Sequence, residues 1–268
     1  TSRTETNMRS LSEDGPFLLV TIPQSHFCEK ARWALDRLGA RYEEERHLPM
    51  LHLPATLLRG GQRTVPLLKT RAGVFDDSTD ILHYLDGFLE PDKKLFPTEN
   101  PARTAVEQLE NHFDEILGPA TRVWVYTHLL PNKELSVSIV EHSVPRYQAV
   151  IGKAMFGVVR GFMKWRLDMN AEAEVSSLKD IRTIFDEVAE RLADGRRYLV
   201  ADRFTAADLT FASLAAVLLL PPEYGGPLPT PEMCPPIMKK VVNELREHPA
   251  GQYGLRLFRE ERPKKRDE

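Results

Sequence analysis

Strand-forming patterns are confined to the first third of this sequence, and helical periodicity governs the rest. Short apolar runs and alternating segments typical of β-strands end before Pro91. Beyond Pro101, apolar residues recur every three to four positions, as in 106–117 and 178–192. The length of 268 residues exceeds the usual size of one domain. We therefore predict an α+β domain at 16–91 and an all-helical domain at 101–268.

The α+β domain is predicted to have the order β-α-β-α-β-β-α. An apolar run at 17–22, ended by Pro23, suits a strand buried on both faces. The segment 28–38 has helical spacing and is followed by Gly39, a residue suited to a left-handed helix stop. The remaining expected elements are strands at 42–48, 64–69 and 74–77, a helix-bearing loop at 49–61, and a helix capped by Ser78.

The remaining segments flank this domain or belong to the helical one. Residues 1–15 are predicted to be a polar, flexible tail, 92–100 a linker, and 262–268 a solvated tail. Segment 131–176 mixes prolines, glycines and apolar residues, so it is either an insertion connecting helices or a set of broken helices.

Helix starts in the second half are predicted from capping-box spacing. This spacing occurs at 177–180 and 205–208. The apolar run 209–220 is too short to cross a bilayer, which takes about 20 residues, and is predicted to be a buried helix.

Composition limits the possible partners. The chain has 36 Lys and Arg against 39 Asp and Glu, so no global field favours nucleic acid or an anionic membrane. Cys28 and Cys234 are too few for a disulfide framework, which favours a reducing, cytoplasmic compartment. No spacing typical of a metal site or a phosphate-binding loop is present, so we expect no metal and no nucleotide cofactor. A small molecule is the expected partner.

The turn between the first strand and the first helix is a candidate reactive site. Backbone amides and the positive end of the helix dipole meet at 25–28 and would stabilise a bound anion. The Ser25 hydroxyl could donate a hydrogen bond to a thiolate there. The alternative is that Ser25 only caps the helix.

Two further motifs could bind a peptide-like ligand. A cis bond between Val65 and Pro66 would turn a backbone amide and carbonyl outward, where they could pair with the ligand backbone. Asp77 and Ser78 precede a helix and could bind the carboxylate and ammonium of an amino acid. The alternative for this pair is again a helix cap.

In this order, the motifs resemble those of the glutathione transferases. The resemblance covers 16–97 and 177–219 and rests on a proline followed by Ser-x-x-Cys-x-Lys-x-Arg at 23–32, Val65-Pro66, Asp77-Ser78 and Phe204-Thr205-Ala206-Ala207-Asp208. It implies a thioredoxin-like N-terminal domain followed by an all-α helical bundle domain. It also implies that Ser25 is the catalytic hydroxyl, that Val65 with Pro66 binds the cysteinyl backbone of glutathione, that Asp77 with Ser78 binds its γ-glutamyl end, and that Thr205 with Asp208 forms a folding cap.

Other ligand contacts are less defined by the sequence. The glycyl carboxylate of glutathione needs a cation or polar group; the candidates are His52, Arg59, Gln62 and Arg63, of which we select His52 and Arg63. Aromatic residues could line a second-substrate pocket or pack in the core: Phe27 and Trp124 foremost, then Tyr126, Phe156, Phe162 and Trp165. We expect His26 to be an exposed loop residue and Cys28 to be buried without a chemical role.

The resemblance implies a homodimeric detoxification enzyme that conjugates the glutathione thiolate to hydrophobic electrophiles, with glutathione as co-substrate. Two alternatives remain open. One is a glutathione-dependent thiol oxidoreductase, which would need a reactive cysteine where Ser25 stands. The other is a noncatalytic binding or assembly protein with the transferase fold.

Overall fold

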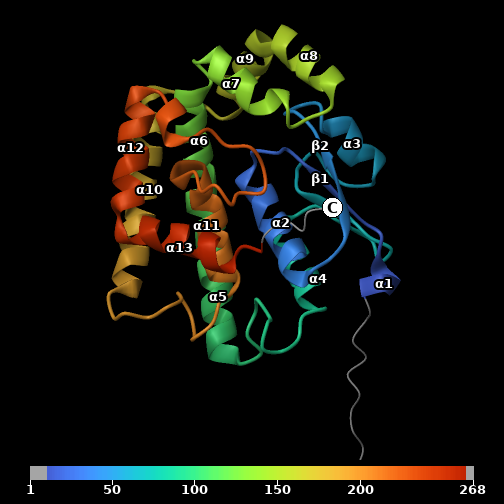
Figure 1. Ribbon diagram of the computed structural model, residues 1–268, viewed down its shortest axis with the longest axis vertical. Helices are drawn as coiled ribbons and strands as arrows, with labels where there is room; N and C mark the ends of the chain where they lie inside the picture. Colours follow the sequence, from blue (N-terminus) through green and yellow to red (C-terminus); the bar gives the residue numbers. More distant parts are fainter. Residues whose placement is uncertain (1–10, 264–268) are drawn as a thin grey trace, which may run out of the picture.

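The computed structural model describes residues 11–263, in which a sheet-containing N-terminal part lies beside a larger set of helices (Figure 1). After α1, the element order of the N-terminal part is the predicted β-α-β-α-β-β-α. Its elements are α1 (Leu11–Asp14), β1 (Phe17–Thr21), α2 (His26–Leu38), β2 (Tyr42–Arg46), α3 (Leu53–Leu58), β3 (Leu67–Lys69), β4 (Val74–Phe75) and α4 (Ser78–Asp86).

The described strands form one sheet with the order β2-β1-β3-β4. Strand β1 pairs parallel to β2 and antiparallel to β3, and β3 pairs antiparallel to β4. Leu19 belongs to the large core shared with α2 and α4, whereas Val20 packs with Ala55 and Leu67 on the α3 side. Both faces of β1 are therefore covered, which explains its unbroken apolar sequence.

The helical part begins after the linker segment. Its elements are α5 (Asn100–His112), the π-helical turn η1 (Phe113–Leu117), α6 (Gly118–Leu129), α7 (Lys133–Glu141), α8 (Arg146–Ala154), α9 (Phe156–Arg166), α10 (Ala171–Leu192), α11 (Ala206–Leu219), the 3-10 turn η2 (Pro231–Met233), α12 (Pro236–Glu247) and α13 (Pro249–Glu261). Every residue of α11 is buried. Helix α11 packs against α2, α5, α6 and α13, so it joins the two parts of the molecule through one continuous core.

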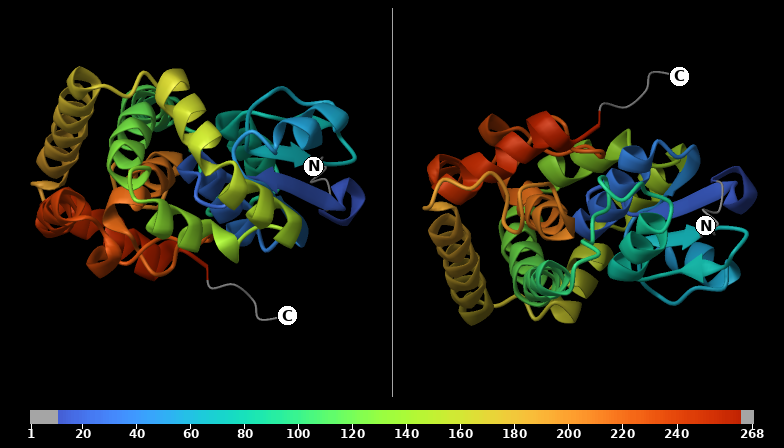
Figure 2. Two further views of the ribbon diagram at one scale, coloured as in Figure 1. Left: turned by 90° about the horizontal axis from the view of Figure 1, so that it is seen from above. Right: turned by 90° about the horizontal axis from the view of Figure 1, so that it is seen from below.

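The uncertain segment 131–176 consists mainly of short broken helices, one of the two alternatives that the sequence left open. Helices α7, α8 and α9 lie beyond the upper end of α6 and extend across the molecule toward β1 and β2 (Figures 1 and 2). Gln148 of α8 anchors them: its Oε1 accepts from the Leu48 backbone amide at 3.0 Å, and its Nε2 lies 2.7 Å from Nδ1 of His47.

Two predicted helix starts are wrong. Asp77, not Ser78, caps α4: its carboxylate accepts from the amides of Thr79 and Asp80, and Ser78 is the first helical residue. Helix α10 starts at Ala171 rather than at Ser177, because the Asn170 side chain caps it by accepting a hydrogen bond from the Ala173 backbone amide. The capping box of Thr205 and Asp208 is confirmed.

Both expected tails need correction where the structure describes them. Residues 11–14 form α1, and Leu11 packs against the core. Arg262 is only 6% exposed, because it pairs with Glu29 and Asp36 and lies over the Trp33 ring. The remaining tail positions, 1–10 and 264–268, lie outside the described residues. No helix within 11–263 is long and apolar enough to span a membrane.

Candidate functional site

A cavity of about 700 Å³ lies between the N-terminal part and the helical part. We call the part of the lining that comes from α2, α6 and α11 the floor of the cavity, and the part that comes from α9 its roof. The main floor residues are Ser25, His26, Phe27, Arg122, Val125, Tyr126 and Val217, and the roof residues are Phe162, Met163, Trp165 and Arg166. The start of α2, which the sequence predicted as the site, thus lies on one side of the cavity. Helix α9, from segment 131–176, lies on the other.

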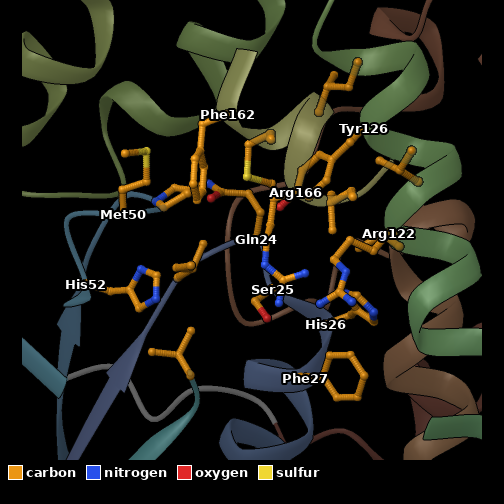
Figure 3. Close-up of a pocket in the computed structure, with 18 of the residues that line it drawn as sticks. Gln24, Ser25, His26, Phe27, Met50, His52, Arg122, Tyr126, Phe162 and Arg166 are labelled. Carbon is orange, nitrogen blue, oxygen red and sulfur yellow. The ribbon is translucent and has the colours of Figure 1, made fainter. Parts of the chain in front are cut away.

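Ser25 is the N-cap of α2 and lines the cavity (Figure 3). Its Oγ accepts a hydrogen bond from the Cys28 backbone amide at 3.4 Å. This bond uses a lone pair, so the hydroxyl proton stays available for an acceptor in the cavity. Capping the helix and donating to a ligand are therefore compatible roles for one hydroxyl.

His26 is buried, contrary to the exposed loop position expected for it. It is the first residue of α2 and only 4% exposed, and its Nε2 lies 3.0 Å from the Gly118 carbonyl oxygen. Burial, together with nearby Arg122, lowers the pKa of His26 to about 3. A neutral ring can donate from Nε2 to this carbonyl, so His26 links α2 to α6 without adding charge to the cavity.

The link to Gly118 depends on an irregular helix. From 100 to 129 the chain is helical without a break, but it passes through the π-helical turn η1 just before Pro119. Proline has no amide proton, and wider turns accommodate the helical hydrogen bonds that are lost. Gly118 lies at this point because the Phe27 ring approaches it: an added Cβ would meet the ring at 2.4 Å.

The Val65-Pro66 peptide bond is cis, as predicted. Val65 lines the cavity, whereas Pro66 is buried behind it. His52 and Arg63 also line the cavity, and Nε2 of His52 lies 3.2 Å from the Arg63 carbonyl oxygen. Burial lowers the pKa of His52. The structure thus brings three predicted contacts together on the side of the cavity formed by the α3 and β3 region.

The other predicted polar contacts lie outside the cavity lining. Asp77 is exposed and caps α4, and Ser78 is buried in that helix. Arg59 pairs with Glu45, and the Gln62 amide donates to Asp76.

The aromatic candidates divide into two groups. Phe27, Tyr126, Phe162 and Trp165 line the cavity, and the figure shows Phe162 above the α2 start and Phe27 below it (Figure 3). Trp124 is 1% exposed and packs in the core beside His128, and Phe156 also lies outside the lining.

Several lining residues were not predicted. Gln24 donates to the Ile139 carbonyl and to Ser143, which ties the α2 turn to α7. Arg122 and Arg166 reach the space near Ser25 from the floor and the roof (Figure 3). One sequence signal could have identified Arg122: it is an isolated charge between the apolar residues of α6.

Neither cysteine is exposed to the cavity. Cys28 has no exposed surface, and burial raises the pKa of its thiol. Within 11–263, no group of three His, Cys, Asp or Glu side chains is arranged to hold a metal ion.

Comparison with known proteins agrees with this architecture. Residues 19–88 match the family described as the glutathione S-transferase N-terminal domain. A search of curated proteins finds no match to the sequence.

Several solved structures share the fold over nearly the whole chain. A possible glutathione S-transferase from Rhodopseudomonas palustris has 16% identity and a TM-score of 0.56, covering 92% of this chain and 94% of its own. The beta-etherase LigF of Sphingobium has 18% identity and a TM-score of 0.56, covering 90% and 98%. A glutathione S-transferase from Methylobacterium radiotolerans, solved with glutathione sulfonate, has 19% identity and a TM-score of 0.51, covering 94% and 97%.

At these identities the structural matches show the fold: a thioredoxin-like domain followed by a helical domain. The sequence match identifies the first of these two domains. Residues 19–88 therefore belong to the glutathione S-transferase N-terminal domain family, and the chain as a whole shares the fold of these glutathione S-transferase structures.

Proposed function

We propose that this protein is a glutathione transferase that conjugates the glutathione thiolate to an electrophilic small molecule. The observation that carries the proposal is the position of Ser25, whose hydroxyl lines the cavity at the amino end of α2. The helix amides and this hydroxyl would together stabilise a thiolate relative to a thiol. The thiol proton passes to solvent, the sulfur forms a bond to an electrophilic carbon, and the leaving group takes the electron pair.

The remaining glutathione contacts are proposals of the same kind. Val65, next to the cis bond, would pair with the cysteinyl backbone, and His52 or Arg63 would bind the glycyl carboxylate. Asp77 and Ser78 would bind the γ-glutamyl end, which must then extend beyond the cavity lining. We also propose a cytoplasmic homodimer.

The burial of Cys28 favours the transferase over a thiol oxidoreductase. A resolving or attacking thiol must be accessible and partly ionised. Cys28 is fully enclosed and its pKa is raised, so it does not meet either requirement.

The decisive experiment is Ser25→Ala. A hydrogen bond to sulfur strengthens as negative charge develops, so we expect a raised pKa of bound glutathione and turnover near neutral pH reduced by about tenfold or more. Ultraviolet titration of the thiolate and initial rates with neutral chlorodinitrobenzene measure the two effects. Ser25→Thr, which keeps the hydroxyl, should restore part of both.

A matched control removes a helix cap elsewhere. Asn170→Ala deletes the side chain that accepts from the Ala173 amide at 2.8 Å, outside the cavity lining. It should cost about 1 kcal/mol of stability and leave the thiolate pKa unchanged. If Ser25→Ala behaves like this control, Ser25 is only a cap and the proposed role is wrong.

The γ-glutamyl assignment has its own test. Asp77→Asn keeps an oxygen that can cap α4 but removes the charge that would pair with the ammonium group. Affinity for glutathione, measured by calorimetry, should fall with little change in melting temperature. Unchanged affinity would contradict the assignment.

A further inference from the structure

The charged residues that line the cavity all have the same sign. Arg63, Arg122 and Arg166 line it, and no Asp or Glu is among its lining residues in the described part of the chain. Elsewhere the lining is mainly apolar. A ligand that neutralises positive charge and fills an apolar space would match this surface.

Arg122 is the unusual member of the set. It is half-buried on α6, and its buried Nε has no hydrogen-bond partner in the structure. No carboxylate in the described residues forms an ion pair with it. Burial lowers its pKa, Tyr126 raises it, and Arg166 lowers it. A cation held in this way is unfavourable unless an anion binds beside it.

Other buried cations of this chain have their counter-charges built in. Lys30 pairs with Glu110 and Asp114 at 2.7 and 2.6 Å. Arg32 likewise pairs with Glu29 and Glu44, and Arg262 pairs with Glu29 and Asp36. The missing counter-charge of Arg122 is therefore a property of the cavity rather than of the protein as a whole.

Arg122 and Arg166 approach the same space from opposite sides. Figure 3 shows the two side chains converging near Ser25, one from α6 and the other from the end of α9. Like charges held near each other repel, and a carboxylate between two guanidinium groups would form charge-assisted hydrogen bonds with both. Apolar residues from both sides, among them Val125, Leu129 and Met163, surround this space.

We infer that the electrophilic substrate is an organic anion: an apolar, aromatic body with a carboxylate or similar group that binds between Arg122 and Arg166. This inference rests on the proposed function. Anchoring the acid between the arginines would orient the apolar body along the roof, with its reactive carbon near the sulfur held by Ser25.

The test uses 4-phenylbutyrate and its neutral amide as probes, measured by calorimetry with the full-length protein. The wild type should bind the carboxylate about tenfold or more tightly than the amide, because only the carboxylate accepts charge-assisted bonds. Arg122→Met and Arg166→Met, which keep most of the apolar stem, should remove this preference. Arg122→Lys should retain part of it.

Arg160→Met is the matched control. Arg160 lies on α9 and is exposed, like Arg166, but it is outside the cavity lining. This variant should bind both probes like the wild type. Equal affinity of the wild type for carboxylate and amide, or no effect of either cavity arginine, would overturn the inference.

Two outcomes separate this inference from the proposed function. If Arg122→Met leaves carboxylate binding intact but weakens glutathione binding or raises its thiolate pKa, the arginines serve glutathione and the inference is wrong. If the wild type binds no glutathione but still prefers the carboxylate, the transferase proposal fails while the anion site stands.

Discussion

The floor of the cavity includes a completely buried helix, whereas its roof is a helix without a buried residue. Helix α11 in the floor is buried along its whole length, while α9 in the roof exposes Val158 and Trp165. Glycines show the same contrast. A Cβ on Gly254, which packs against α11, would meet Leu219 at 2.7 Å, but one on Gly161 of α9 would meet nothing within 4 Å.

This difference in packing means that the floor and the roof of one cavity can contribute differently to stability and to ligand specificity. Tightly packed residues determine whether the chain folds, because every lost contact there leaves a void or an unpaired group. Loosely packed residues can change with little cost to folding, and they can still contact a ligand. We therefore expect substitutions in the roof to change acceptor selectivity with little loss of stability, and substitutions in the tightly packed floor helices to lower stability first.

The strongest test of this contrast exchanges the same residue type in both places. Trp124→Ala, in the core on the floor helix α6, should cost about 3–5 kcal/mol, because it leaves a large hole there. Trp165→Ala in the roof should change stability by no more than about 0.5 kcal/mol, since that side chain is 76% exposed. Urea denaturation gives both values, and similar costs would remove the distinction.

The cap of α11 should have the next largest effect. Asp208 accepts from the amides of Leu199 and Thr205 and from the hydroxyl of Tyr253. Asp208→Ala leaves these buried donors unpaired and should lower the free energy of unfolding by about 2–4 kcal/mol. Asp202→Ala, which changes an exposed neighbour, is the control and should leave stability nearly unchanged. The comparison is by chemical denaturation. A cost below that of an ordinary surface mutation would show that α11 does not depend on its cap.

Paired glycine substitutions should give effects of opposite sign. Gly254→Ala should destabilise the protein by about 1–3 kcal/mol because the added methyl group overlaps Leu219. Gly161→Ala should stabilise it by about 0.5–1 kcal/mol, since alanine favours a helix and the space is open. Melting temperatures measured side by side check the signs. If both variants are destabilised, the roof is packed as tightly as the core between α11 and α13.

The smallest predicted effect is a pH dependence at η1. Burial raises the pKa of Asp114 to about 6; Lys30 lowers it, and Glu110, which shares that lysine, raises it. A carboxyl whose pKa is higher in the folded state stabilises the protein at low pH, and this contribution is lost as pH rises through about 6. Between pH 5 and 8 the wild type should thus lose about 1 kcal/mol more stability than Asp114→Asn. Parallel denaturation curves at the two pH values measure this, and identical pH profiles would contradict it.

Local sequence patterns determined the N-terminal topology and the main motifs. The apolar run of β1, the Gly39 stop and the capping box at Thr205 each depend on residues a few positions apart. Such short-range requirements are visible in sequence because neighbouring residues satisfy them. The cis bond between Val65 and Pro66 was also predicted, because the order of the surrounding motifs supported it.

Tertiary structure alone decided how the cavity is closed and charged. Arg262 joins Glu29 across more than two hundred positions, and Arg166 comes to face Arg122 only because α9 folds over the floor. A sequence shows that a charge is present, but not whether another part of the chain will pair with it. That depends on which distant segments the hydrophobic core brings together. Here the core pairs Arg262 with carboxylates, whereas Arg122 has no carboxylate partner among residues 11–263.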